Sequence, residues 1–211
     1  MRIPLIVTLE ANAPEVAPFP ALDSSARLRR IHSDGDHVTM IKLDKIGCLD
    51  SFGGRMDTVF GFDEPSKQQW EVTFTSSRIM FWHPMTVGIF GNKPKLKSGK
   101  ATGGHLYYDS IGGLSAGYMN GNIPFLSCTC LRQDGTMSHI YMQSDISTLE
   151  KVVKECHLRI SSHLESAGFS DNDEIRQKWA SFPDSIWKQK DADVRVVVPY
   201  AKLFEVANRR V

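Results

Sequence analysis

The chain has 211 residues, of which 41% are hydrophobic and 23% are charged, and its 25 Lys and Arg nearly balance its 24 Asp and Glu. This length and composition are typical of a globular protein with one sizeable core. The formal net charge of +1 gives no global attraction to nucleic acid, and no apolar run reaches the roughly 18 to 20 residues that cross a bilayer as a helix. We therefore expect neither a nucleic-acid partner nor an integral membrane segment.

The first ten residues, MRIPLIVTLE, predict a β-strand, because their apolar run is short and Pro4 interrupts it. Such a run does not make the core of a signal peptide, so we expect a cytoplasmic protein whose four cysteines stay reduced. Residues 11–20 contain three prolines, which exclude a helix, and this segment predicts an extended connector.

Segments with β-strand character then follow one another as far as residue 143. They cover residues 37–43, 56–62, 70–75, 78–83, 105–114, 124–132 and 137–143. Ser76-Ser77 and Asp134-Gly135 predict the turns of two hairpins. Residues 91–104, rich in Lys and Gly, predict a long loop. Short strands at this spacing predict an antiparallel sandwich or barrel.

Residues 147–168 change to a helical period. Six apolar side chains recur on one helical face: Leu149, Val152, Val153, Cys156, Ile160 and Leu164. Ser147 with Glu150 predicts a capping box at the start of this helix, and Gly168 predicts its C-terminal cap.

The remaining residues, 169–211, predict a helix, a strand and a last helix in the segments NDEIRQKWASF, DVRVVVPY and AKLFEVANRR. We expect this extension to pack on the same domain, with its strand beside the N-terminal one. The predicted organisation is therefore a domain over residues 1–168, including the first strand and the Pro-rich connector, with a C-terminal extension over 169–211.

Part of this pattern resembles a known group of domains. WEVTFTSSRIMFWHP, with Thr75, Arg78 and Ile79, resembles the strand–turn–strand of GRAM and bacterial pleckstrin-homology (PH) domains. HLYYDSIGGLSAG resembles their next segment, and LRQDGTMSHIYM with the helix after it resembles their final hairpin and capping helix. The likeness covers roughly residues 70–166.

The resemblance implies a mainly β, α+β protein. Its fold would be a PH-like antiparallel β-barrel or sandwich of about seven strands, capped by a C-terminal amphipathic helix and extended at both termini. PH-like domains bind lipids, peptides or proteins, so the resemblance implies a binding module without naming its ligand.

One motif points to catalysis. The stretch from Gly113 to Gly117 matches G-x-S-x-G, the nucleophile elbow of serine hydrolases, with Ser115 as the nucleophile. An elbow needs a helix directly after the serine, whereas YMNGNIPF follows here and predicts a turn. We interpret the stretch as the glycine-rich exit of a barrel strand and expect no enzyme. The alternative is a small serine hydrolase that combines Ser115 with His105 or His139 and with Asp109 or Asp134.

Other clusters lack a complete functional set. Cys128 and Cys130 share one strand face without the further pair that a zinc site needs, so they predict core packing. HSDGDH, residues 32–37, predicts a turn, with a divalent-cation site as the alternative. KSGKAT, residues 97–102, lacks the first glycine and the Ser/Thr of a P-loop. His105, Tyr107 and Asp109 would share one exposed strand face. We expect no metal and no cofactor.

Four lysines, Lys93, Lys95, Lys97 and Lys100, form a candidate ligand-binding group in the predicted loop. Their ammonium groups could bind an anionic lipid headgroup or a phosphorylated partner, although surface lysines more commonly serve solubility. The function we favour is a non-catalytic cytoplasmic binding module of unknown ligand, acting through protein–protein interaction or self-association. Peripheral binding to anionic lipid headgroups through these lysines is the alternative.

Overall fold

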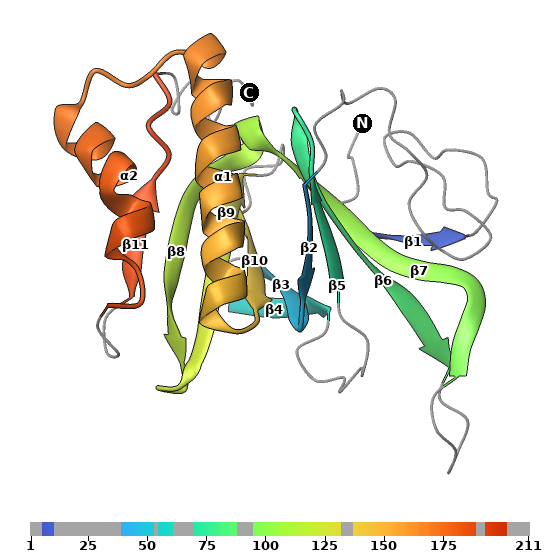
Figure 1. Cartoon of the computed structure of the whole chain (residues 1–211). Coiled ribbons are helices and arrows are strands. Elements are labelled where there is room, and N and C mark those ends of the chain that lie inside the picture. The colour runs from blue at the N-terminus through green and yellow to red at the C-terminus, as the bar shows by residue number, and fades with distance from the viewer. Residues whose placement is uncertain are drawn as a thin grey trace. The chain divides into compact units, whose positions relative to one another are not determined.

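The computed structural model describes residues 6–10, 39–52, 55–60, 70–87, 95–131, 137–188 and 193–201, with side chains for 39–47, 70–81, 106–130, 139–188 and 193–201. The chain divides into two units, one formed by residues 1–42 and 65–106 and the other by residues 43–64 and 107–211. Each unit contains one antiparallel sheet, and the described helices belong to the second (Figure 1). The expected mainly β, α+β class is confirmed. Among the described strands, each sheet is open, with two edge strands, and neither closes into a barrel.

The first unit holds a five-stranded sheet. Its strands, in spatial order, are β1 (Ile6–Glu10), β7 (Lys95–Tyr107), β6 (Arg78–Val87), β5 (Trp70–Phe74) and β2 (Thr39–Leu43). The expected hairpin is confirmed, since β5 pairs with β6 around Ser76 and Ser77. Side chains on both faces of this hairpin are buried: Val72, Phe74, Ile79 and Phe81 on one, and Thr73, Thr75, Arg78 and Met80 on the other.

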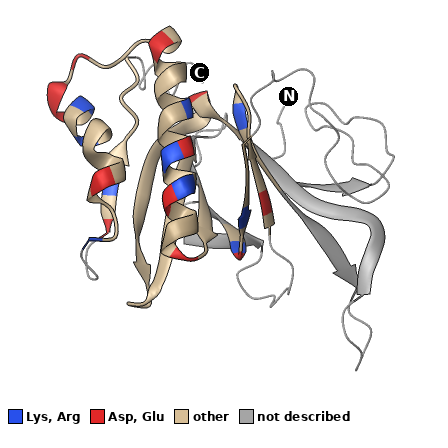
Figure 2. Ribbon diagram, viewed as in Figure 1, with Lys and Arg blue, Asp and Glu red and all other residues tan. Residues whose placement is uncertain are grey.

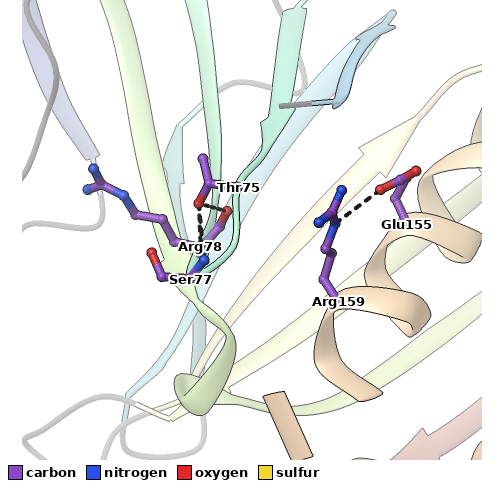
Figure 3. A network of polar contacts seen from close by, with 5 residues as sticks. All are labelled: Thr75, Ser77, Arg78, Glu155 and Arg159. Atoms are coloured by element: carbon purple, nitrogen blue, oxygen red, sulfur yellow. Dashed lines mark hydrogen bonds and ion pairs between the residues drawn. The ribbon is translucent and has the colours of Figure 1, made fainter. Parts of the chain in front are cut away.

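Thr75 closes the turn of this hairpin (Figure 3). Its Oγ1 accepts hydrogen bonds from the backbone N–H of Arg78 at 3.1 Å and of Ser77 at 3.3 Å, and its hydroxyl donates to the Arg78 carbonyl at 2.9 Å. The backbone N–H of Thr75 bonds to the same carbonyl at 3.0 Å. The threonine of the Thr-x-x-Arg pattern is therefore explained by a side chain that satisfies the backbone groups of a tight turn.

The loop expected over residues 91–104 is wrong from Lys95 onward. Residues Lys95–Tyr107 form β7, which pairs with β1 from Ile6↔Gly104 to Glu10↔Lys100. The strand expected over 105–114 is also interrupted, because Tyr108–Ser110 form a 3₁₀ turn. The sequence of β7 does not predict a strand, because it is rich in Lys and Gly and lacks an alternation of apolar and polar residues. It forms a strand because the neighbouring strands hydrogen-bond to it.

The second unit holds a six-stranded sheet. Its strands, in spatial order, are β11 (Val194–Val197), β8 (Ile111–Met119), β9 (Ile123–Leu131), β10 (Met137–Gln143), β3 (Lys45–Phe52) and β4 (Arg55–Phe60). Asn120 and Gly121, with φ of 53° and 75°, make the turn from β8 to β9. The positive φ values explain the Asn-Gly pair, since these residues tolerate the left-handed region best.

Helix α1 (Ile146–Ala167) confirms the predicted amphipathic helix. All six residues of the expected apolar face are buried, and Gly168 ends the helix with a φ of 89°. The expected capping box is wrong: Asp145 is the N-cap, and its carboxylate accepts from the Thr148 N–H at 2.9 Å and the Thr148 hydroxyl at 2.7 Å. One turn apart on α1, Arg159 pairs with Glu155 at 3.4 Å, and both side chains are half-buried (Figure 3).

Helix α2 (Asp173–Ser185) confirms the expected helix and packs on α1 through Trp179. The Trp179 indole stacks on the His157 ring with centroids 4.7 Å apart, and its Nε1–H donates to the Ser161 hydroxyl at 3.0 Å. Pro183 lies four residues after Trp179 and has no N–H to give the Trp179 carbonyl. His157 Nε2 lies 3.0 Å from that oxygen, and because a carbonyl only accepts, Nε2 carries the proton.

Strand β11 is hydrogen-bonded to β8, from Val194↔Ala116 to Val197↔Gly113, so the expectation that it pairs with the N-terminal strand is wrong. The chain after it stays in the second unit: Tyr200 donates its hydroxyl to the Tyr108 carbonyl, and the Ala201 N–H bonds to the Gly168 carbonyl at 3.0 Å. Burial raises the pKa of Tyr200, which keeps this donor protonated. The expected last helix, from residue 202 on, lies outside the described residues.

Two glycines of β8 allow the close approach of the C-terminal segment. A Cβ on Gly113 would lie 2.9 Å from the Val196 carbonyl oxygen, and a Cβ on Gly117 would lie 1.9 Å from Asp193 Oδ1. The Gly117 carbonyl accepts from the Trp187 indole N–H at 3.1 Å. These positions need glycine because a side chain would occupy the place of the neighbouring segment.

Replacement of Gly113 by Ala should destabilise the protein by about 1–3 kcal/mol, because β11 must shift away from the new methyl group. Urea unfolding followed by Trp fluorescence measures this loss. Ser115→Ala is the matched control on the same strand and should change stability by less than about 0.5 kcal/mol. Equal midpoints for Gly113→Ala and the wild type would contradict the close approach.

The protein should lose stability between pH 7 and pH 5 through His157. Partial burial lowers the pKa of His157 below its ordinary value of 6.5, against the opposing effects of the Trp179 carbonyl and Asp184. The unfolded chain therefore takes up the proton first, and stability falls as pH drops through 6.5 toward the lowered value. His157→Gln keeps a donor for the Trp179 carbonyl but does not titrate, so its unfolding midpoint should change less than the wild type's over this range. An identical pH dependence for both proteins would refute the assignment.

Candidate functional site

The two faces of the six-stranded sheet differ in chemistry. Helix α1 packs against β9 and α2 against β11. The face under the helices is apolar, with buried Leu114, Ala116, Leu126, Cys128, Ile140 and Met142. Because successive side chains of a strand alternate between faces, the odd-numbered positions of β8, β9 and β10 lie on the opposite face.

This opposite face is formed by short hydroxyl side chains beside aromatic ones. Register places Ser115, Ser127 and Tyr141 in one row, and Gly113, Thr129 and His139 in the next. We call it the hydroxyl face and define it by these six residues with Met119, Ile123, Phe125, Gln143, Arg195 and Val197.

Side-chain contacts organise the centre of the hydroxyl face. The rings of Phe125 and Tyr141 lie 5.8 Å apart and those of Tyr141 and His139 lie 6.4 Å apart, as cross-strand and same-strand neighbours. Thr129 Oγ1 and His139 Nδ1 are 3.2 Å apart. This bond and the two ring contacts restrict the His139 side chain and orient its ring beside Tyr141.

The hydroxyl face is partly exposed and carries no charge on its central strands. Val197 is 46% exposed and Ile123 is 40% exposed, while Ser115 and Tyr141 are half-buried. Strands β8, β9 and β10 contain no Lys, Arg, Asp or Glu, whereas α1 and α2 carry many (Figure 2). Charge appears at the β11 edge, where Arg195 lies 3.8 Å from Asp193. Protein interfaces are depleted in charge at their centres and enriched in Tyr, Phe, Met and Arg.

The backbone around Ser115 differs from that of a nucleophile elbow. It lies within β8, with Ser127 and Arg195 as its cross-strand neighbours, and β8 continues as a strand to Met119. His139 is two strands away, about 10 Å at ordinary strand spacing, and its Nδ1 bonds to Thr129. Among the described side chains, none donates to or accepts from Ser115.

Of the other residues of the hydrolase alternative, Asp109 has a described side chain. Asp109 is exposed in the 3₁₀ turn, so the expectation that it shares a strand face with His105 and Tyr107 is wrong. The side chain of His105 and the whole of Asp134 lie outside the described residues.

The four candidate lysines lie at the start of β7 and before it. Lys95, Lys97 and Lys100 belong to β7, where only the backbone is described, and Lys100 is opposite Glu10. Lys93 lies outside the described residues, as do residues 32–37 of the HSDGDH segment. The ligand-binding role of the lysines stays a prediction.

The two cysteines of β9 are buried under α1, and the Cys130 thiol lies 3.8 Å from the Cys128 carbonyl. In the part of the chain that the structure describes, no cluster of three His, Cys, Asp or Glu side chains could hold a metal ion. The same part contains no helix long and apolar enough to cross a membrane.

Ser127 and Thr129 could have been found from the sequence, because they alternate with Cys128 and Cys130 in FLSCTCL. Their neighbours could not, since only strand register places Tyr141 and His139 beside them. Comparison with protein families, with curated proteins and with solved structures finds no match to this chain.

A fluorophosphonate probe should not label Ser115, because no base among the side chains that the structure describes lies within the 2.6–3.2 Å that activates a serine nucleophile. Mass spectrometry of the probe-treated protein measures the modification, with Ser115→Ala as the control. Labelling of the wild type that disappears in Ser115→Ala would establish the hydrolase alternative instead.

Proposed function

We propose that this protein is a non-catalytic binding module that uses the hydroxyl face to bind another protein. The observation that carries the proposal is that the face over β8, β9 and β10 has no charge, with half-buried Ser115, His139 and Tyr141 around the buried Ser127. A sheet face that meets only water commonly carries charged side chains, whereas an uncharged face with aromatic side chains suits a protein partner.

The geometry of the face supports this use. Tyr141 and His139 are held by ring contacts and by Thr129, so little side-chain entropy is lost when a partner covers them. Ile123 and Val197 offer apolar area at two margins, and the Arg195 side chain at the β11 edge offers a charged one.

A PH-like fold is part of the proposal. Its support is the order of the elements: hairpin β5–β6, the segment that becomes β7 and β8, hairpin β9–β10 and then α1 follow one another as in the resemblance. A cytoplasmic location and a division at residue 168 are further parts of the proposal. The partner is a second protein or a second copy of this chain, and anionic lipid is the alternative.

Self-association should be visible in sedimentation velocity as a sedimentation coefficient that rises from low to high micromolar concentration. Ile123→Glu and Val197→Glu place a carboxylate on the hydroxyl face and should abolish the rise, because the interface would have to bury an unpaired charge. Leu158→Glu is the matched control, since Leu158 is 55% exposed on α1 and lies away from this face.

For a different protein partner, a photo-crosslinking residue at position 123 should capture one defined protein in cells, and Val197→Glu should prevent the capture. The same residue at position 158 should capture nothing comparable. Vesicles of anionic lipid test the alternative, because only headgroup binding predicts co-sedimentation that weakens steeply with salt and with Lys95, Lys97 and Lys100→Ala. A monomer that is captured by nothing through position 123 would overturn the proposed function.

A further inference from the structure

The outer side of β11 presents backbone groups that a further strand could use. Strand β11 is one edge of the six-stranded sheet, and among the described strands none pairs with its outer side. The Val198 N–H donates to the Gly112 carbonyl at 3.0 Å, so the even-numbered residues of this segment are hydrogen-bonded to β8. The N–H and C=O groups of Arg195 and Val197 therefore point outward, away from β8.

The length of this outer edge is defined by its surroundings. Beyond Val197, the outer side is occupied, because the Pro199 carbonyl accepts from the Ser170 N–H at 2.8 Å. Before β11, Asp193 continues alongside β8, since a Cβ on Gly117 would lie 3.1 Å from the Asp193 Cα. The groups that a further strand could use therefore run from Asp193 to Val197.

The two charged side chains of this edge have opposite signs. Asp193 and Arg195 are two positions apart, with Oδ2 and Nη2 separated by 3.8 Å, and their side chains are 40% and 78% exposed. Edge strands that are protected against pairing commonly carry lysine, whose like charge repels a second copy. Opposite charges two positions apart instead attract an antiparallel copy of the same strand, because each carboxylate then faces a guanidinium.

We propose that β11 pairs antiparallel with β11 of a second copy of this chain, so that the two sheets join edge to edge. The outward groups are satisfied when Asp193 of each copy lies opposite Arg195 of the other. Val194 then faces Val194 of the second copy at the two-fold axis. A shift of the register by two residues would place Arg195 opposite Arg195, and this like-charge contact opposes it.

Edge pairing goes beyond binding through the hydroxyl face and does not rest on it. A two-fold axis perpendicular to the sheet keeps both hydroxyl faces on one side, so the pair of chains presents this face twice. A partner that contacts both copies would bind with the gain of a bivalent attachment. Because the paired segment is short, we expect a weak association that covalent trapping detects better than sedimentation.

A disulfide at the two-fold axis tests the pairing. The full chain with Cys48→Ser carries Val194→Cys, and the three described cysteines are buried. Diamide should join two such chains through their new cysteines, because facing residues that are not hydrogen-bonded have Cα atoms about 4.5 Å apart. Leu158→Cys, at a position 55% exposed on α1, measures random collision. In non-reducing electrophoresis, Val194→Cys should form dimer at least about tenfold faster than Leu158→Cys. Equal rates would overturn the proposal.

Charge exchange tests the register. In the Val194→Cys chain, Arg195→Asp makes carboxylates face each other and Asp193→Lys makes cations face each other, so either change should reduce the rate to that of Leu158→Cys. An equal mixture of the two chains should recover the fast rate, since every cation then faces a carboxylate. The same mixture built on Leu158→Cys controls for general attraction. A mixture as slow as its components would overturn the proposal, and poor folding of either variant cannot imitate the recovery.

Ile123→Glu separates this inference from the proposed function. Ile123 lies on the hydroxyl face, two strands away from β11, so Ile123→Glu should leave the trapping at position 194 unchanged. Loss of trapping in Ile123→Glu would show that two copies meet through the face and would overturn edge pairing. A mixed disulfide between position 194 and a different protein in cells, without the dimer, would overturn it as well. Failure of the trapping leaves capture through position 123, and with it the proposed function, unaffected.

Discussion

The arrangement of the sheet and helices in the second unit depends on the close approach of β11 to β8. A Cβ atom at position 113 would lie too close to the carbonyl of Val196, and a Cβ atom at position 117 would lie too close to the carboxylate of Asp193. Glycine at both positions lets the C-terminal strand join the sheet. This pairing makes β8 an inner strand of the sheet, and the helix that precedes β11 is thereby placed beside α1.

The contact between the two helices is then completed by a proline. Pro183 gives no N–H to the Trp179 carbonyl, and His157 of α1 supplies the missing donor while its ring stacks on the indole. The hydrogen bond that α2 lacks at the Trp179 carbonyl is thus replaced by a bond from α1, and this bond fixes the position of one helix against the other. With one face of the sheet covered in this way, the uncharged side chains of the other face become the feature that suggests binding.

Periodic patterns predicted the elements they dominate. The apolar face of α1 and the hairpin of β5 and β6 follow from spacing alone, because helix and strand periods are local properties. β3 and most of β7 were missed, since KIGCLDSF and KLKSGKATGGHLY show no clean alternation and are strands because their neighbours bond to them. The sequence predicts only part of the candidate site. Ser127 and Thr129 alternate with buried cysteines in one strand, whereas their aromatic neighbours come from β10 and are placed there by strand pairing.

By itself, the sequence determined the class of the protein, the extent of its main helix, and the absence of a helix after Ser115, because these depend on short-range pattern and on the conformational limits of Gly, Asn and Pro. Only the tertiary structure decided that the C-terminal strand joins β8 and that Tyr141 and His139 lie beside Ser127 and Thr129. These contacts depend on register and on layer packing, which are set by the energy of the whole assembly rather than by any one segment.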